Sequence, residues 1–290
     1  MAFVTELGTA ELVAAALEAE RQFVQSLGGH TLSLAGGRLV TNERIPIPRF
    51  NFIQELNVHV ERKTAFFERA LDHYFQRALR PTLRAEVPVP EHLDRTLTKM
   101  GFRANKEPLR LLIARSETPP NASSSIQVRA ARPEEVDQIV SFWTDEPYRA
   151  ELRRGIDVLW NHPNPEEELV PMLACLDAEL VSAALVYRYG RSTTIHFVST
   201  LPVARGQGAA TQLVHEVLVG ARARPHQRVS IFAESSRLEG RLRSIGFEVV
   251  RRYALYELPP EAELALPPVG PTSPPRWRPP RNPPGERPAS

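Results

Sequence analysis

The residues VSTLPVARGQGAATQLV, numbered 198–214, decide the fold. Apolar residues typical of a strand lead through Pro202 into the small-residue run 205–210 (RGQGAA), and an apolar helix follows at once. Small residues at the start of a helix let a ligand approach the backbone closely, and the N–H groups that are free at that end converge on an anion. The segment therefore predicts a phosphate-binding loop between a strand and a helix.

The composition of this loop excludes two common phosphate sites. No Lys-Ser or Lys-Thr pair follows the glycines, so the loop is not a nucleoside-triphosphate site with a metal ligand. The third glycine of a dinucleotide-binding fingerprint would fall at Thr211. What remains is the pattern Arg-x-x-Gly-x-Ala, formed by Arg205, Gly208 and Ala210.

Strands and helices alternate around this loop, which predicts α/β layers. In the second half we expect strands at 126–130, 172–176, 181–187, 192–199, 228–233 and 247–258, and helices from 133, at 206–222 and at 237–244. In the first half we expect a helix from Thr9, as its cap, to Leu27, a hairpin at 32–40, strands at 50–58, 82–87 and 109–115, and helices at 63–79 and 91–99.

An internal repeat links the two halves. The segment LDRTLTKMGF (93–102) aligns with LEGRLRSIGF (238–247) at an offset of 145 residues. The same offset carried back from Gly208 reaches Lys63, at the start of the first half's long helix. Two copies of one fold are the organising hypothesis, and chance agreement of two short amphipathic helices is the alternative.

Proline and serine mark the expected boundaries. The segment SETPPNASSS (116–125) interrupts the apolar pattern, and 12 of the 27 prolines lie in the last 32 residues, which indicates a disordered or polyproline tail. We expect domains at 1–116 and 126–258, a linker at 117–125 and a disordered Pro/Arg-rich tail at 259–290. The tail is a plain extension or a weak docking segment, since PxxP occurs at 271–274 and 280–283.

Composition bounds the class of protein and its partners. Hydrophobic residues make up 42% and charged residues 24%, as in globular proteins, and the formal net charge of +2 favours neither nucleic acid nor membrane as a partner. The single cysteine, Cys175, cannot form an internal disulfide, and no apolar stretch is long enough to span a membrane. The eight histidines do not fall at metal-ligand spacing. We expect a cytoplasmic protein without a metal.

The loop and its context resemble a known family. With Pro202 before it and Gly246-Phe247 after it, the Arg-x-x-Gly-x-Ala pattern is similar to the acetyl-CoA pyrophosphate loop of the GNAT superfamily of N-acetyltransferases, over residues 126–258. The first half, with FNFIQEL (50–56) and LTKMGF (97–102), resembles the degenerate amino-terminal lobe of tandem GNAT proteins. The resemblance implies two tandem lobes, each a mixed, mostly antiparallel sheet flanked by helices. It also implies one acetyl-CoA site, because Glu61 and no glycine stand where the first lobe's loop would be.

The resemblance also implies which residues hold acetyl-CoA. The loop would bind the pyrophosphate, and the backbone of the preceding strand would bind the pantetheine arm. These residues are Arg205, Gly206, Gln207, Gly208, Ala209 and Ala210 for the pyrophosphate, and Val198, Ser199 and Thr200 for the pantetheine.

Direct attack of an amine on the thioester requires a base, an N–H group for the oxyanion and an acid for the thiolate. Where many relatives have the acid tyrosine this chain has Leu242, and Ser235 stands where an asparagine is common. The candidate catalytic residues are Glu234, His196 and Ser235, with Tyr187, Tyr189, Tyr253, Ser236 or water as other proton donors. Glu234 also fits a solvated strand end or helix cap, and His196 a packed strand histidine.

The resemblance also implies that the acceptor side lies in the segment between residues 130 and 172. It holds aromatic and acidic residues that suit a cationic amine, namely Trp143, Asp145, Glu146, Tyr148, Trp160, His162, Glu166, Glu167 and Glu168. Residues 164–168 (NPEEE) are also typical of an ordinary helix start. The sequence thus predicts an N-acetyltransferase for an amine of a small molecule or protein. The alternatives are a non-catalytic acyl-CoA sensor or adaptor, and an interaction protein that acts through its tail.

Overall fold

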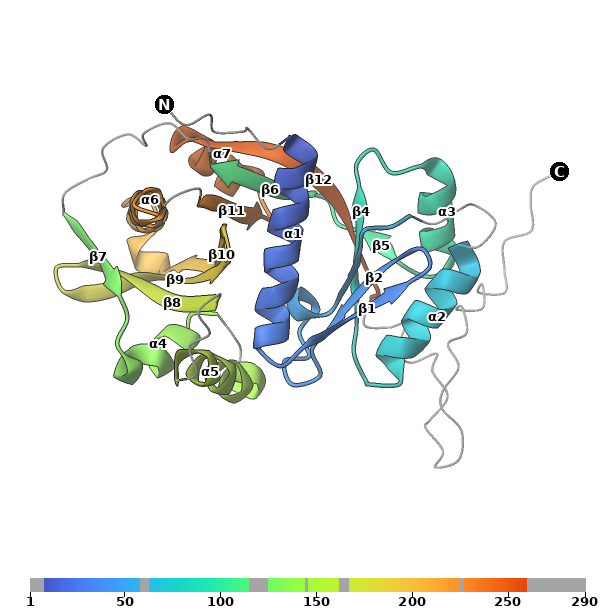
Figure 1. Cartoon of the computed structure of the whole chain (residues 1–290), viewed down its shortest axis with the longest axis horizontal. Coiled ribbons are helices and arrows are strands. Elements are labelled where there is room, and N and C mark those ends of the chain that lie inside the picture. Colours follow the sequence, from blue (N-terminus) through green and yellow to red (C-terminus); the bar gives the residue numbers. More distant parts are fainter. Residues whose placement is uncertain are drawn as a thin grey trace. The chain divides into compact units, whose positions relative to one another are not determined.

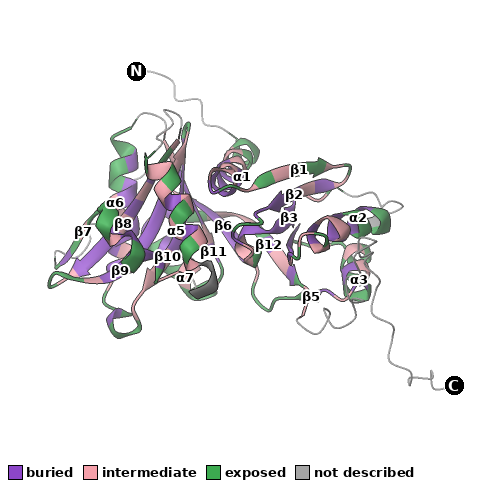
Figure 2. Cartoon of the chain, turned by 90° about the horizontal axis from the view of Figure 1, so that it is seen from below, coloured by how far each residue is buried: buried purple, intermediate pink, exposed green. Residues whose placement is uncertain are grey.

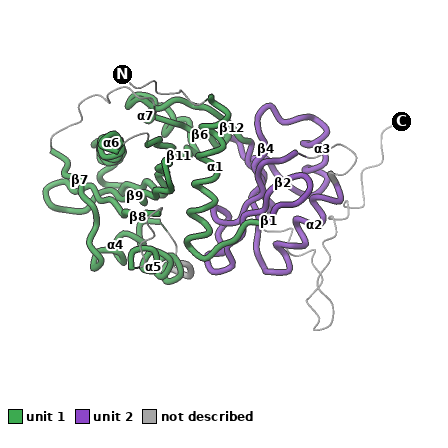
Figure 3. Tube along the Cα trace, in the orientation of Figure 1, with its two compact units in different colours: residues 1–31, 107–253 green, residues 32–106, 254–290 purple. Residues whose placement is uncertain are grey.

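The computed structural model describes residues 8–57, 63–114, 125–143, 146–161, 167–224 and 227–259 (Figure 1). Most of the expected linker, the tail from residue 260, Glu61, Asp145, His162 and Glu166 lie outside the described residues. The chain divides into two compact units (Figure 3). Unit 1 comprises Met1–Thr31 and Glu107–Tyr253, and unit 2 comprises Leu32–Lys106 and Ala254–Ser290.

Unit 1 contains a mixed sheet with the strand order β12-β6-β11-β10-β9-β8-β7. Its strands are β6 (Leu109–Ala114), β7 (Ile126–Ala130), β8 (Glu167–Leu176), β9 (Glu179–Tyr189), β10 (Ser192–Thr200), β11 (Arg228–Ala233) and β12 (Phe247–Glu257). β10 and β11 are parallel, and all other neighbouring pairs in this order are antiparallel. The prediction of an α/β fold with a mixed, mostly antiparallel sheet is confirmed.

Helices cover both faces of this sheet. α6 (Ala209–Arg222) and α7 (Ser236–Ser244) pack into the main core with Ile195 and Ile231. On β10 the next residue, His196, points to the opposite face, because side chains alternate along a strand. There it meets Phe23 of α1 (Thr9–Ser26). β9 and β10 are therefore largely buried (Figure 2).

Two further helices, α4 (Val136–Val140) and α5 (Glu146–Asn161), follow β7, with the 3-10 turn η2 (Pro133–Glu135) before α4. Trp143 and Trp160 pack against a small core that includes Ile139 and Leu173. The helix-start interpretation of residues 164–168 is wrong for Glu167 and Glu168, because both belong to β8.

Unit 2 has the strand order β1-β2-β3-β4, with β5 paired to the end of β12. Its elements are the later residues of β1 (His30–Leu34), β2 (Gly37–Thr41), η1 (Pro48–Phe50), β3 (Phe52–Gln54), α2 (Lys63–Phe75), β4 (Thr82–Glu86), α3 (Glu91–Lys99) and β5 (Arg103–Ala104). β3 and β4 are parallel, and Ile53 and Leu83 share a core with α2.

Three expected elements of the first half differ from the structure, and in the second half β8 begins at Glu167 and not at residue 172. Gly8, not Thr9, occupies the cap position of α1. The strand expected at 50–58 covers only β3, because residues 48–50 form a 3-10 turn. α2 ends at Phe75 because Ala78 turns to a φ of 54° and the N–H of Leu79 bonds back to the carbonyl of Tyr74.

The internal repeat recurs in the structure. In each unit a helix joins two parallel strands, as β3-α2-β4 and as β10-α6-β11. α3 and α7 are each followed by a glycine at positive φ, 89° at Gly101 and 94° at Gly246, and then by a buried phenylalanine. Glycine adopts this conformation without a steric cost.

The units do not follow the halves of the sequence. β6 was expected in the domain 1–116, but it pairs antiparallel with both β11 and β12. α1, from the same expected domain, contacts β9 and β10. Both elements therefore belong to unit 1 with the residues of the expected domain 126–258.

The packing of α1 in unit 1 is testable through Phe23, which is buried and stacks on His196 with 3.9 Å between ring centroids. We expect Phe23→Ala to lower the free energy of unfolding by about 3–5 kcal/mol, because it leaves a cavity in a packed core. The neighbouring Gln22→Ala should change it by about 0.5 kcal/mol or less, since Gln22 is only half-buried. Chemical denaturation measures both, and equal small effects would contradict this packing.

Candidate functional site

The pairing of the parallel strands β10 and β11 is incomplete. It runs from Ser192 opposite Arg228 to Ile195 opposite Ile231 and ends there, although β10 continues to Thr200. On its other side β10 pairs with β9, with a register shift between His196 and Ser199. Val198 belongs to neither pairing. The last part of β10 thus has backbone groups on the β11 side that the sheet does not use.

The shift is accompanied by an unusual backbone conformation at Phe197, whose φ is 56°. Such a conformation is rare for a residue with a side chain and marks local strain. The strand is held after the shift by Ser182 of β9, whose hydroxyl donates to the carbonyl of Ser199 at 2.6 Å. The bulge therefore fixes residues 198–200 in a defined position.

The predicted loop follows directly. Gly206 and Gly208 have φ values of 90° and 89°, and Gly208 occupies the cap position of α6. Apart from the adjoining residues of the chain, no atom lies within 4 Å of a Cβ built on either glycine, so the space beside both is open. α6 has no side-chain cap, and its first turn holds no acidic residue. These features fit an anion at the N-terminus of α6.

Arg205 joins the loop to the strand. Its Nε donates to the carbonyl of Thr200 at 3.4 Å, and its side chain is exposed. Residues 198–200 and 205–210 therefore form one continuous strand, loop and helix start.

The other candidates divide between two places. Glu234 is exposed just after β11, and Ser235 caps α7 with its Oγ accepting from the N–H of Leu238 at 3.2 Å. Because β10 and β11 are parallel, their ends lie at the same edge of the sheet, so Glu234 and Ser235 share an edge with the loop. His196 lies elsewhere: it is 4% exposed, lies under Phe23, and its Nε2 is 2.7 Å from Thr194 Oγ1.

The position at which the resemblance implies an acid tyrosine is occupied by a buried, apolar side chain. Leu242 belongs to α7, and its side chain is buried in the main core. Among the tyrosines proposed as substitutes, Tyr187 is fully buried, and burial raises the pKa of its phenol above the ordinary value. A phenol with a raised pKa is a weaker proton donor.

Three residues of the expected acceptor segment have structural contacts. Trp143 and Trp160 are packed against the core described above. Glu168 forms ion pairs with Arg188 at 2.7 Å and Arg224 at 2.8 Å. Burial alone would raise the pKa of the Glu168 carboxyl, but its hydrogen bonds and charge interactions with these two arginines outweigh burial and hold it below the usual range. Glu168 is therefore a structural carboxylate.

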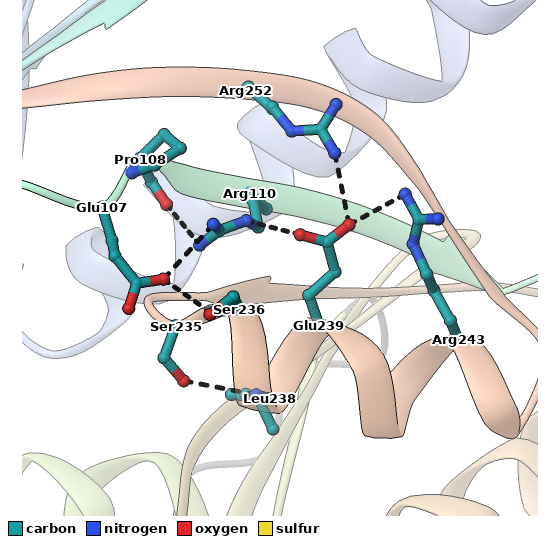
Figure 4. A network of polar contacts seen from close by, with 9 residues as sticks. All are labelled: Glu107, Pro108, Arg110, Ser235, Ser236, Leu238, Glu239, Arg243 and Arg252. Carbon is teal, nitrogen blue, oxygen red and sulfur yellow. Dashed lines mark hydrogen bonds and ion pairs between the residues drawn. The ribbon is translucent and has the colours of Figure 1, made fainter.

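Two residues near this edge were not predicted from the sequence. Glu107 lies beside the start of α7, and Arg110 of β6 connects it to Glu239 (Figure 4). No local motif marks them, because they reach α7 only through the pairing of β6 with β11.

Within the described residues, no group of three or more His, Cys, Asp or Glu side chains is arranged to hold a metal ion. No described helix is both long and apolar enough to cross a membrane.

Comparison with known families and structures agrees with this geometry. Residues 128–247 match the model of the acetyltransferase (GNAT) family. The chain contains a GNAT-family domain. The match includes β10, the loop, α6, β11 and α7, which are the elements that build the candidate site. No curated protein sequence matches the chain.

Solved structures extend the similarity of fold beyond this domain. A GCN5-related N-acetyltransferase from Kribbella flavida aligns with a TM-score of 0.58 and 14% identity, over 84% of this chain and 95% of its own. One from Sphaerobacter thermophilus aligns with a TM-score of 0.57 and 16% identity, over 87% and 92%. A tandem GNAT protein from the clavulanic acid biosynthesis pathway aligns with a TM-score of 0.53 and 14% identity, over 78% and 80%.

The role of Ser235 as a helix cap can be tested by stability. Ser235→Ala should lower the free energy of unfolding by about 1 kcal/mol, because the N–H of Leu238 loses its acceptor. Ser235→Asn should leave the stability nearly unchanged, since the asparagine oxygen caps a helix equally well. Urea denaturation compares the three proteins, and an alanine variant as stable as the wild type would contradict the cap.

Proposed function

We propose that this protein is an acetyl-CoA-dependent N-acetyltransferase that transfers the acetyl group to an amine of a small molecule or protein. The observation that carries the proposal is the end of β10–β11 pairing at Ile195 and Ile231, next to an uncapped helix start with two glycines at positive φ. The first feature offers backbone groups to an extended pantetheine chain, and the second offers N–H groups to a pyrophosphate.

The residues at this edge fit the cosubstrate. Gly206, Gln207, Gly208, Ala209 and Ala210 would hold the pyrophosphate. Arg205 would add a positive charge, and its guanidinium already bonds to the carbonyl of Thr200. The backbone of Val198, Ser199 and Thr200 would align the pantetheine and polarise the carbonyl. When bound, acetyl-CoA supplies an activated thioester that a neutral amine can attack directly.

Of the candidates for the base, Glu234 fits better than His196. A base must reach the amine directly or through one water. Glu234 is exposed at the edge where β11 ends, whereas His196 is buried beneath α1. The Ser235 hydroxyl accepts a hydrogen bond as a cap and still has its own O–H to donate, so Ser235 and water both stay candidate proton donors for the thiolate.

A second function is favoured by one observation, the burial of Leu242 where many relatives have the acid tyrosine. A protein that keeps the loop without this acid would serve as a non-catalytic acyl-CoA sensor or adaptor. Release of free thiol from acetyl-CoA with a panel of amines separates the two functions. A transferase releases thiol in proportion to acylated amine, and a sensor binds without turnover.

We further infer a tandem arrangement in which unit 2 is a degenerate GNAT-like lobe without a cofactor site. The parallel strands β3 and β4 joined by α2 support this, because they repeat the arrangement of β10, α6 and β11. In the sequence, residues 60–65, which align with the phosphate loop, contain Glu61 and no glycine. The Pro/Arg-rich tail is a plain extension or a weak docking segment in this proposal.

The cofactor site is testable by Gly208→Glu. We expect the affinity for acetyl-CoA to fall by roughly 100-fold or more, because the side chain enters the open space at the start of α6 and its charge repels the pyrophosphate. The matched control is Gly190→Glu, since Gly190 also has a positive φ and open surroundings but lies in the turn between β9 and β10.

Both variants should lose about 1–2 kcal/mol of stability, because a side chain is strained at positive φ. Isothermal titration calorimetry with acetyl-CoA then separates the loss of affinity caused at the loop from the loss of stability that both variants share. Equal affinities in Gly208→Glu and Gly190→Glu would refute the assignment of the loop.

The choice of base is testable by rate. Glu234→Gln should lower kcat by roughly 100-fold or more, as the loss of a general base does. His196→Asn should lower the melting temperature and leave the pH dependence of kcat unchanged. A loss of rate confined to His196→Asn would instead assign the base to the histidine.

A further inference from the structure

The segment before β6 reaches the candidate site through strand pairing. β6 and β11 are antiparallel, and Arg110 lies opposite Ala233, the last residue of β11. Residues that precede Arg110 therefore extend past the end of β11. This places Glu107 beside the start of α7, at the edge where β10 and β11 end.

Glu107 contacts the first turn of α7 directly. Its Oε2 accepts from the N–H of Ser236 at 2.6 Å, although the two residues are 129 positions apart in the chain. Together with Ser235, whose Oγ accepts from Leu238, it gives α7 two caps (Figure 4). The hydrogen bond from Ser236 holds the pKa of the Glu107 carboxyl below its usual range, because it stabilises the ionised form that accepts it.

A buried arginine ties this contact to the body of α7. The Arg110 side chain is 8% exposed, and its Nε lies 2.6 Å from Glu239 Oε2. Its Nη2 donates to Glu107 Oε2 at 3.3 Å, and its Nη1 donates to the carbonyl of Pro108 at 2.8 Å. A buried guanidinium is stable only when its charge is paired, so these contacts are difficult to rearrange.

Glu239 completes the connection. Besides Arg110, it pairs with Arg243 of α7 at 2.8 Å and with Arg252 of β12 at 3.2 Å. One network therefore joins β6, β12 and two points on α7 (Figure 4). The turn that carries Glu234 and Ser235 lies between the end of β11 and this anchored helix.

We propose that Glu107 is a positioning residue of the transfer site. Its carboxylate accepts from the N–H of Ser236 and thereby fixes the turn 234–236 against the end of β11. The rate of transfer then depends on a residue from the segment that precedes the GNAT domain. This rests on the proposed function. Glu107 acts through the turn and need not touch the substrate.

The experiment uses the full chain and compares Glu107→Ala with Glu107→Gln. We expect Glu107→Ala to lower kcat by roughly 10- to 100-fold, the effect of a small misplacement of a catalytic group. The KM for the amine should change much less, and the affinity for acetyl-CoA should not change. Glu107→Gln should recover most of the rate, because its amide oxygen still accepts from Ser236.

Glu135 provides a closely matched control in unit 1. Its Oε2 accepts from the backbone N–H of Arg132 at 2.8 Å, and its Oε1 pairs with Arg129 at 2.5 Å, at the start of η2. Glu135→Ala should therefore lose a comparable backbone cap and ion pair. Its kcat should equal that of the wild type.

Each outcome decides the proposal. A normal kcat in Glu107→Ala, a loss shared by Glu135→Ala, or no recovery in Glu107→Gln would overturn the positioning role while leaving the proposed function intact. If the wild-type protein releases no thiol with any amine, the proposed function itself fails, and this role fails with it.

Discussion

The site depends on one constraint, the parallel pairing of β10 and β11 that stops at Ile195 and Ile231 while β10 continues. The shift at His196–Ser199 and the strained Phe197 redirect the strand at that point. Backbone N–H and C=O groups that would form hydrogen bonds within a regular sheet can then form them with another molecule. The loop turns on two glycines into α6 at the same edge, so the backbone positions that suit an extended chain adjoin those that suit an anion.

The second constraint is the insertion of β6 between β11 and β12. Without it, both strands would present unpaired edges, which proteins avoid by covering or pairing them. The insertion brings a buried arginine into the sheet, and this arginine requires carboxylates around it. Glu239 on α7 and Glu107 before β6 meet that requirement, so the pairing that completes the sheet also anchors the helix beside the candidate site.

Part of the fold and of the candidate site was predictable from short-range sequence patterns. The glycines at 206 and 208 identified the loop, and β7, β11 and α3 have the bounds expected from their apolar patterns and flanking residues. The placement of α1 and β6 was not predictable, because strand order and helix docking arise from contacts between residues far apart in the chain. For the same reason the sequence showed His196 as a candidate base without revealing that Phe23 covers it. The cap role of Ser235 was also missed, although serine before a helix is a recognised signal.

The cofactor site is tested most directly by a calorimetric titration of acetyl-CoA into the purified protein, with stoichiometry as the deciding quantity. Saturable binding at one molecule per chain is expected, since within the described residues the interrupted strand pairing and the glycine loop occur together in unit 1. Two molecules per chain would show that unit 2 also binds the cofactor. No binding by the folded protein would show that the interrupted pairing and the loop do not form a cofactor site.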